Sequence, residues 1–162
     1  MKLSFSTLGC PDFSWSDIYS MAKDFGFQGI ELRGFGDNIF SVHAEPFKGT
    51  ELSKTINTLK KLRLEIPCIS SGTPLCYDNT RDKAMAELEE YIELARQLNA
   101  PYIRVLADIN IEMGNEIDDN IIIDSMKKLA PAAEAAGVTL LIETNGAYSD
   151  TKRLGTVLTK IA

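Results

Sequence analysis

The feature that most limits the possible folds of this chain is a repeated alternation between short strand-like segments and longer amphipathic segments. Five segments have the length and the apolar patterning of strands: residues 2–7, 28–33, 64–70, 102–107 and 138–142. Each is followed by a segment with helical spacing of apolar residues: residues 14–26, 50–62, 80–98, 117–136 and 151–162. Strands that alternate with helices predict a parallel sheet with right-handed helical crossovers.

The ends of the predicted helices carry recognisable signals. Ser14 and Asp17 have the spacing of a capping box at the start of the first helix. Asn79 and Asp82 could cap the third helix in the same way. Pro131 falls within the fourth helix, where we expect it to kink or interrupt the backbone.

The predicted strands have two different faces. In the first, second, fourth and fifth strands one face is aliphatic, as with Ile103 and Val105 in the fourth. The opposite face carries polar or charged residues: Ser4, Ser6, Glu31, Arg33, Arg104, Thr139 and Glu143. In a barrel the aliphatic face meets the outer helices and the mixed face looks into the centre. A doubly wound sheet would bury these polar groups under helices at a cost, so we favour the barrel.

The chain length limits how much of a barrel can form. A complete (β/α)₈ barrel needs about 250 residues and eight units, whereas this chain has 162 residues and five units. We therefore predict a single α/β domain over residues 1–162, made of the N-terminal five βα units of an incomplete TIM-type barrel. Either the chain is a fragment of a longer protein, which we favour, or it completes its sheet by self-association. An open five-stranded sheet with exposed edges is the remaining alternative.

Charge and cysteine content narrow the choice of partners and compartment. The net charge of −6 argues against a nucleic-acid backbone as the main partner, because phosphate binding needs a basic face. No apolar run is long enough to cross a bilayer. The three cysteines are an odd number without the spacing of a metal site, so reduced thiols in the cytoplasm are the simplest expectation.

The most informative stretch for function is GVTLLIETNGAYSD, residues 137–150. It contains a predicted strand, then Glu143 at the strand's carboxyl end, then a loop of small and polar residues before the last helix. Barrel enzymes of the α/β class carry their reactive groups at such strand ends. Glu143 is therefore the principal candidate for a functional residue.

Several stretches together resemble the sugar phosphate isomerase/epimerase family. They are ELR in the second strand, ISSGTPL in the third, PYIRVL in the fourth and AAGVTLLIETNGAYSDT around the fifth. That family has a xylose isomerase-like TIM barrel and includes hydroxypyruvate isomerases, ketose 3-epimerases and inosose dehydratases. The resemblance covers the whole chain and about the first five-eighths of the family's barrel. It implies an enzyme that transfers a proton next to a carbonyl of a sugar or sugar phosphate. Because the chain holds only part of that barrel, we expect residues 1–162 alone to show weak or no catalysis.

The same resemblance implies one divalent metal ion. The family binds it with a Glu on the fifth strand and with an Asp, a His and a Glu on later strands. Only Glu143 matches a ligand in this chain; the other three would lie past Ala162. Carboxylate ligands suit Mg²⁺ or Mn²⁺, and a mixed set with histidine also admits Co²⁺ or Zn²⁺. Glu143 could bind the metal and move a proton, or it could simply pair with an arginine.

Two charged residues of the predicted inner face are candidates for substrate binding. Glu31 could accept a hydrogen bond from a substrate hydroxyl, or it could pair with Arg33 or Arg104 inside the barrel. Arg104 could hold a phosphate or carboxylate group by a two-point contact, or it could form an internal salt bridge.

Two loop residues are further candidates. His43, the only histidine, lies in the loop after the second strand. It could contact substrate, although a lone loop histidine is more often a solvent-exposed or packing residue. Asn145 stands where many family members carry histidine. It could orient a water molecule on the metal, or take a left-handed turn before Gly146.

Three functions remain open from the sequence. The leading hypothesis is a metal-dependent sugar or sugar-phosphate isomerase or epimerase, with a small-molecule partner, no nucleic acid, no membrane and a possible homo-oligomer. The second is a non-catalytic half-barrel that self-associates. The third is a nuclease similar to endonuclease IV. It is disfavoured because that family implies histidines at the ends of the third and fourth strands, where this chain has Ser70-Ser71 and Leu106-Ala107.

Overall fold

The computed structural model describes residues 1–36, 38, 40–109 and 117–162, which form five alternating strand and helix units. The strands are β1 (Ser4–Ser6), β2 (Gly29–Glu31), β3 (Cys68–Ser70), β4 (Tyr102–Val105) and β5 (Thr139–Ile142). The α-helices are α1 (Trp15–Asp24), α2 (Gly49–Leu62), α3 (Asp78–Leu98), α4 (Asp119–Ala135) and α5 (Thr151–Ile161). Short 3₁₀ helices lie in the loops: η1 (Thr7–Gly9), η2 (Ser41–His43), η3 (Glu45–Phe47) and η4 (Gly146–Ser149).

The strands are parallel and follow the order of the chain. β1 pairs with β2, and β3 pairs with β4, which pairs with β5. Two parallel bridges, Gly29 with Glu65 and Leu32 with Ile69, join the two sheets through β2 and β3. The five strands therefore form one continuous parallel array, as the alternating sequence pattern predicts.

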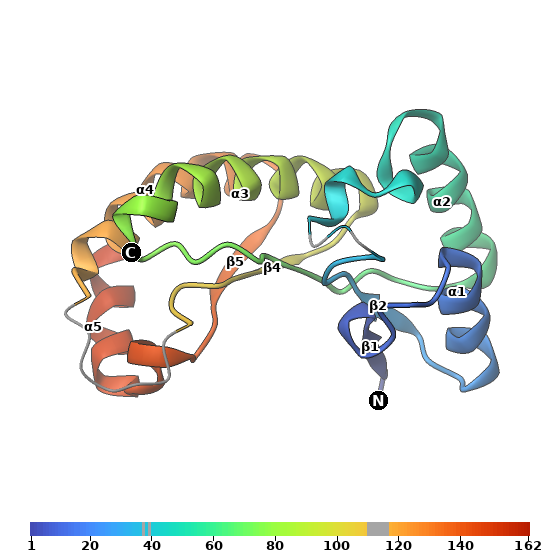
Figure 1. Ribbon diagram of the computed structural model, residues 1–162, viewed down its shortest axis with the longest axis horizontal. Coiled ribbons are helices and arrows are strands. Elements are labelled where there is room, and N and C mark those ends of the chain that lie inside the picture. The colour runs from blue at the N-terminus through green and yellow to red at the C-terminus, as the bar shows by residue number, and fades with distance from the viewer. Residues whose placement is uncertain (37, 39, 110–116) are drawn as a thin grey trace.

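The helices lie outside the strands, which confirms the predicted fold class of five βα units of an incomplete barrel. In Figure 1, α3 and α4 run side by side along one side of the strands, with α5 at the left and α1 and α2 at the right. Ile30, Ile69 and Ile103 are completely buried on the face that meets these helices. On the opposite face Tyr102 and Leu141 remain 44% and 41% exposed. This difference between the two faces is what a barrel interior requires.

The predicted signals at helix starts are confirmed in one case and wrong in the other. Ser14 Oγ accepts the Asp17 N–H at 3.2 Å, and the Asp17 carboxylate accepts the Ser14 N–H at 3.1 Å, so the capping box is present. The predicted cap by Asn79 and Asp82 is wrong, because α3 already begins at Asp78 and both residues lie within its first turns.

Of the two effects predicted for Pro131, a kink or an interruption of the helix, the interruption is wrong. It lies inside α4, which is a single helix from Asp119 to Ala135. Pro131 is exposed, so water can hydrate the carbonyl group that the missing N–H leaves unpaired.

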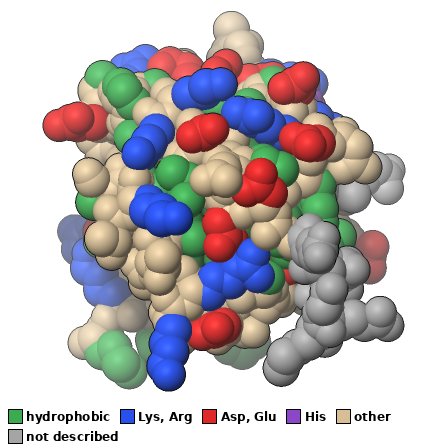
Figure 2. All heavy atoms as spheres, turned by 90° about the vertical axis from the view of Figure 1, so that its left-hand side faces the viewer, with side chains coloured by type: hydrophobic (Ala, Val, Ile, Leu, Met, Phe, Trp, Pro, Cys, Tyr) green, Lys and Arg blue, Asp and Glu red, His purple; other side chains and the backbone are tan. Residues whose placement is uncertain are grey.

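The surface shows no segregation of charge on the face that carries α5. Figure 2 shows lysine and arginine side chains interspersed with aspartate and glutamate on this face, with smaller apolar areas between them. Such mixing is typical of a solvated surface. In the described parts of the chain, no helix combines the length and apolarity needed to cross a bilayer.

Candidate functional site

The polar residues of the inner strand face gather at the carboxyl ends of β2 to β5. Glu31 is the last residue of β2, and its carboxylate accepts a hydrogen bond from the Ser70 hydroxyl at the end of β3. Ser70 is in register with Arg104 on β4. Arg104 in turn reaches Glu143, which directly follows β5. The structure thus brings together three of the predicted site residues, one from each of three strand ends.

This group contains an ion pair between Arg104 and Glu143. Arg104 Nη1 lies 3.0 Å from Glu143 Oε2, and the two side chains are 19% and 37% exposed. The Glu143 N–H donates to the Val105 carbonyl at 3.1 Å, so the strand ladder fixes the backbone at this point. The second oxygen, Oε1, has no hydrogen-bond partner among the described residues. This oxygen is therefore available to a cation while Oε2 holds Arg104.

The carbonyl oxygen of Ser71 accepts hydrogen bonds from two guanidinium groups. Arg33 Nη1 donates to it at 2.5 Å and Arg104 Nη1 at 3.3 Å. Burial lowers the pKa of Arg104, the neighbouring Arg33 lowers it further, and Glu143 opposes both effects. Among the described residues no carboxylate forms a salt bridge with Arg33. The sequence suggested that Glu31 could pair with Arg33 or Arg104, but neither ion pair forms among the described residues. Glu31 accepts a hydrogen bond from the Ser70 hydroxyl instead.

Asn145 shapes the loop after Glu143. Its side-chain oxygen accepts the Gly146 N–H at 2.8 Å, and its own N–H donates to the Glu143 carbonyl at 2.9 Å. The positive φ predicted for Asn145 occurs one residue later, at Gly146, where φ is 55°. Asn145 itself is extended, with φ of −124°. Glycine takes the left-handed conformation because it has no Cβ to obstruct it.

His43 lies apart from this group, against the outer helix α3. Its Nε2 atom is 3.5 Å from Glu90 Oε2, and its ring is 4.5 Å from the ring of Phe40. The backbone of the preceding turn is fixed to the same helix, since the Ser41 N–H donates to the Tyr91 hydroxyl at 3.2 Å. The loop after β2 therefore folds over α3 and carries His43 with it.

Sequence reasoning missed one acidic residue at these strand ends, Asp108. It is 1% exposed, three residues after the end of β4. Its Oδ1 accepts a hydrogen bond from the Tyr77 hydroxyl, and its Oδ2 accepts the Ala147 N–H at 2.7 Å. The signal that could have identified it is an acid directly after an apolar strand of a barrel.

The thiol of Cys76, next to this carboxylate, should resist alkylation. Burial raises its pKa to about 12, and the nearby charge of Asp108 adds to the effect. At pH 8 the reactive thiolate is then only about one part in ten thousand, since each pH unit below the pKa reduces it tenfold. We expect iodoacetamide to leave Cys76 unmodified in the native protein and to label it in urea, as measured by peptide mass spectrometry. Rapid labelling of the native protein would contradict this burial.

A complete metal site does not form within the described residues. No three histidine, cysteine, aspartate or glutamate side chains gather closely enough there to hold an ion. Glu143, with one oxygen lacking a described partner, suits a single carboxylate ligand to Mg²⁺ or Mn²⁺. The described residues therefore supply one candidate ligand, Glu143, of the metal site that the sequence resemblance implies.

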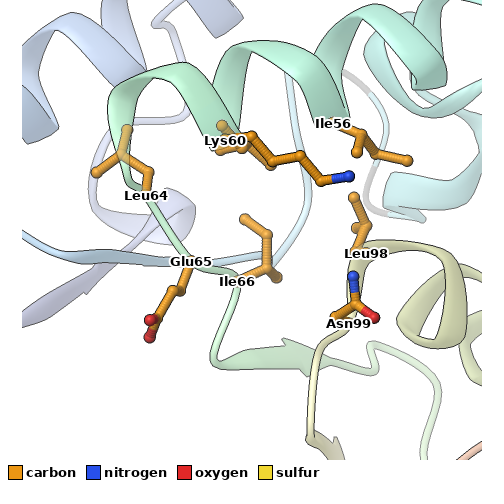
Figure 3. Close-up of a pocket in the computed structure, with 8 residues that line it drawn as sticks. Ile56, Lys60, Leu64, Glu65, Ile66, Leu98 and Asn99 are labelled. Carbon is orange, nitrogen blue, oxygen red and sulfur yellow. The ribbon is translucent and has the colours of Figure 1, made fainter.

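A hollow of about 170 Å³ lies at the other end of the strands. Figure 3 shows it between α2, the segment before β3 and the end of α3. Its lining is Ile56, Leu59, Lys60, Leu64, Glu65, Ile66, Leu98 and Asn99. In TIM barrels the amino ends of the strands serve stability, whereas the carboxyl ends carry the chemistry. The Glu143 end of the strands is therefore our candidate for the functional site.

Comparison with known proteins agrees with this arrangement. A family model described as xylose isomerase-like TIM barrel matches residues 20–157. No curated protein matches the chain significantly in sequence.

Solved structures share the fold at low sequence identity. The probable 3-DHS dehydratase AsbF from Bacillus anthracis is 22% identical with a TM-score of 0.71, over 99% of this chain and 59% of that one. D-psicose 3-epimerase, solved in the presence of D-fructose, is 14% identical with a TM-score of 0.77, over 100% and 60%. A barrel protein from Mycobacterium smegmatis in complex with magnesium is 13% identical with a TM-score of 0.72, over 99% and 60%. The chain thus spans about three fifths of the length of these proteins.

Proposed function

The chain belongs to the xylose isomerase-like TIM-barrel family. On that premise we propose that it forms part of a divalent-metal-dependent sugar or sugar-phosphate isomerase or epimerase. The observation that carries the proposal is the position of Glu143. It stands at the carboxyl end of β5, half-exposed, with one carboxylate oxygen on Arg104 and the other without a described partner. The structural likeness to a D-psicose 3-epimerase and to a dehydratase supports an enzyme of this general kind.

Glu143 would serve as one ligand of the metal ion. A bound Mn²⁺, Mg²⁺, Co²⁺ or Zn²⁺ would polarise the substrate's carbonyl oxygen and stabilise negative charge on it. The likeness to a barrel protein solved with magnesium supports a metal in this fold. The complete site needs further ligands, which the family resemblance assigns to an Asp, a His and a Glu on later strands.

The remaining inner-face residues would bind and orient the substrate. Arg104 offers guanidinium donors to a phosphate, a carboxylate or a polarised oxygen, and the ion pair with Glu143 fixes its direction. Glu31, bonded to the Ser70 hydroxyl, would accept a hydrogen bond from a substrate hydroxyl. Asn145 would hold the loop that follows Glu143. We leave His43 out, because its described contacts are on α3.

The test is an assay for interconversion of a panel of ketoses and ketose phosphates. We expect turnover with added Mn²⁺ or Co²⁺ from a protein that also carries the further ligands on later strands, its loss after treatment with EDTA, and its return when metal is added back. Residues 1–162 alone should show weak or no turnover, because the described residues form no complete metal site. Absence of turnover with every sugar and metal would reject the proposal for the protein assayed. If that inactive protein were also a stable dimer by light scattering, the self-associating half-barrel would become the better description.

A further inference from the structure

The loop between Glu143 and Tyr148 is closed by its own hydrogen bonds, and the Tyr148 side chain at its end is completely buried. The Asn145 N–H donates to the Glu143 carbonyl at 2.9 Å, and the Tyr148 N–H donates to the Asn145 carbonyl at 3.0 Å. The Asn145 side chain closes the turn by accepting the Gly146 N–H at 2.8 Å. Within this locally closed loop, the Ala147 N–H points away from the loop and donates to Asp108 at 2.7 Å.

Asp108 joins this loop to the loops after β3 and β4. Tyr77, at the start of α3, donates its hydroxyl to Oδ1, and Ala147 donates its backbone N–H to Oδ2. The loop after β3 is also bonded to the loop after β4, because the Cys76 N–H donates to the Ala107 carbonyl at 3.0 Å. Three successive loops at the functional end of the strands therefore meet at one carboxylate.

The burial of Asp108 makes a purely space-filling role a poor explanation. A carboxylate that is only 1% exposed loses its hydration, which is costly unless hydrogen bonds replace it. An apolar side chain would fill the same space without that cost. What a carboxylate adds is two acceptors that can hold two donors from different loops at once.

We propose that Asp108 is a positioning residue, whose carboxylate holds the loop after β5 and thereby orients Glu143 toward Arg104. The inference rests on the proposed function, because it assigns Asp108 a role through Glu143. The connection between the two residues is short, because Ala147 is only four residues from Glu143 and the intervening turn is closed by its own hydrogen bonds. Loss of the Ala147 bond releases the middle of that turn from Asp108, between the strand ladder at Glu143 and the buried Tyr148.

The test compares three variants by nuclear magnetic resonance, without metal or substrate. Asp108→Ala removes both acceptors. Asp108→Asn keeps both contacts, because its amide oxygen can accept the Ala147 N–H while its amide group donates to the Tyr77 oxygen. Tyr148→Phe is the matched control in the same loop, because it removes only the hydroxyl bond to Asp119, at 3.1 Å.

We expect Asp108→Ala to raise the exchange rate of the Ala147 amide hydrogen about tenfold relative to amides of α2, since it removes one hydrogen bond locally. The same variant should shift the Arg104 guanidinium signal toward its unpaired position. Asp108→Asn and Tyr148→Phe should leave that signal unchanged. Once Glu143→Gln has removed the carboxylate, Asp108→Ala should no longer move it.

An unchanged Arg104 signal in folded Asp108→Ala would overturn the proposal, and so would an equal shift in Tyr148→Phe. If Asp108→Ala does not fold, two other measurements decide whether Asp108 has this positioning role. The wild-type Ala147 amide must be protected, and Asp108→Asn must keep the Arg104 signal; failure of either rejects the role. Because no turnover is measured, these outcomes do not depend on whether Glu143 binds a metal.

Discussion

Replacing Ile103 with alanine should lower the free energy of unfolding by about 2–5 kcal/mol, the range for truncation of a large buried aliphatic side chain. Ile103 is completely buried in β4, on the face that meets the outer helices. Its removal leaves a cavity between the strand and those helices that the surrounding structure cannot fully close. Urea unfolding followed by circular dichroism measures the loss, with an unchanged slope showing that the unfolded state is unaffected.

The adjacent residue provides the matched control. Tyr102 belongs to the same strand, but it faces the barrel centre and is 44% exposed. Tyr102→Ala should cost less than about 1 kcal/mol, because much of its ring is already in contact with water. Similar losses for Ile103→Ala and Tyr102→Ala would mean that helices or another chain cover both faces. That outcome would contradict the open interior on which the functional site depends.

The two-faced strand pattern explains why the fold class could be predicted from sequence. Ile103 and Arg104 are neighbours in the chain, yet one is fully buried and the other is partly exposed beside Glu143. A period of two residues directly encodes which side of a strand a residue occupies. Once one face is aliphatic and the other mixed, the layering of helices and strands follows from burial alone.

Strand boundaries were less predictable, and Pro67 shows why. The sequence predicts a strand over residues 64–70, whereas β3 contains only Cys68–Ser70. Glu65 does reach the neighbouring strand, by donating its N–H to the Gln28 carbonyl at 2.9 Å. Pro67 has no N–H to donate, so the ladder between these two points is interrupted. Composition reveals the apolar run, but the hydrogen-bond ladder decides where the strand is continuous.

The candidate site could be predicted only as a face, not as a set of contacts. Period and strand end place Glu31, Arg104 and Glu143 on the same side at the same end. Which carboxylate pairs with Arg104 depends on the register between β4 and β5, which no short segment specifies. His43 and Asp108 depend on how loops fold back onto the scaffold. His43 was expected near the site but contacts Glu90 of α3. Asp108 was overlooked, although it accepts the Ala147 N–H from the loop after Glu143.

Replacing Glu143 with glutamine should reduce metal-dependent turnover by about 10²–10⁴-fold, the range for loss of a group that transfers a proton. The expectation applies to the protein and sugar that the ketose assay identifies. Glutamine has the size of glutamate and can still accept a hydrogen bond from Arg104. It has no negative charge to bind a divalent cation and cannot take up a proton near neutral pH. Initial rates at saturating Mn²⁺, compared with wild type, measure the effect.

Stability should separate this result from damage to the fold. Glu143 is 37% exposed, so loss of its ion pair with Arg104 should cost no more than about 1 kcal/mol. Glu65→Gln is the control, because that acid pairs with Lys2 at 2.6 Å near the amino ends of the strands. It should leave turnover unchanged. A folded Glu143→Gln protein that keeps its activity would show that Glu143 only supports Arg104, and the metal would then have to bind elsewhere.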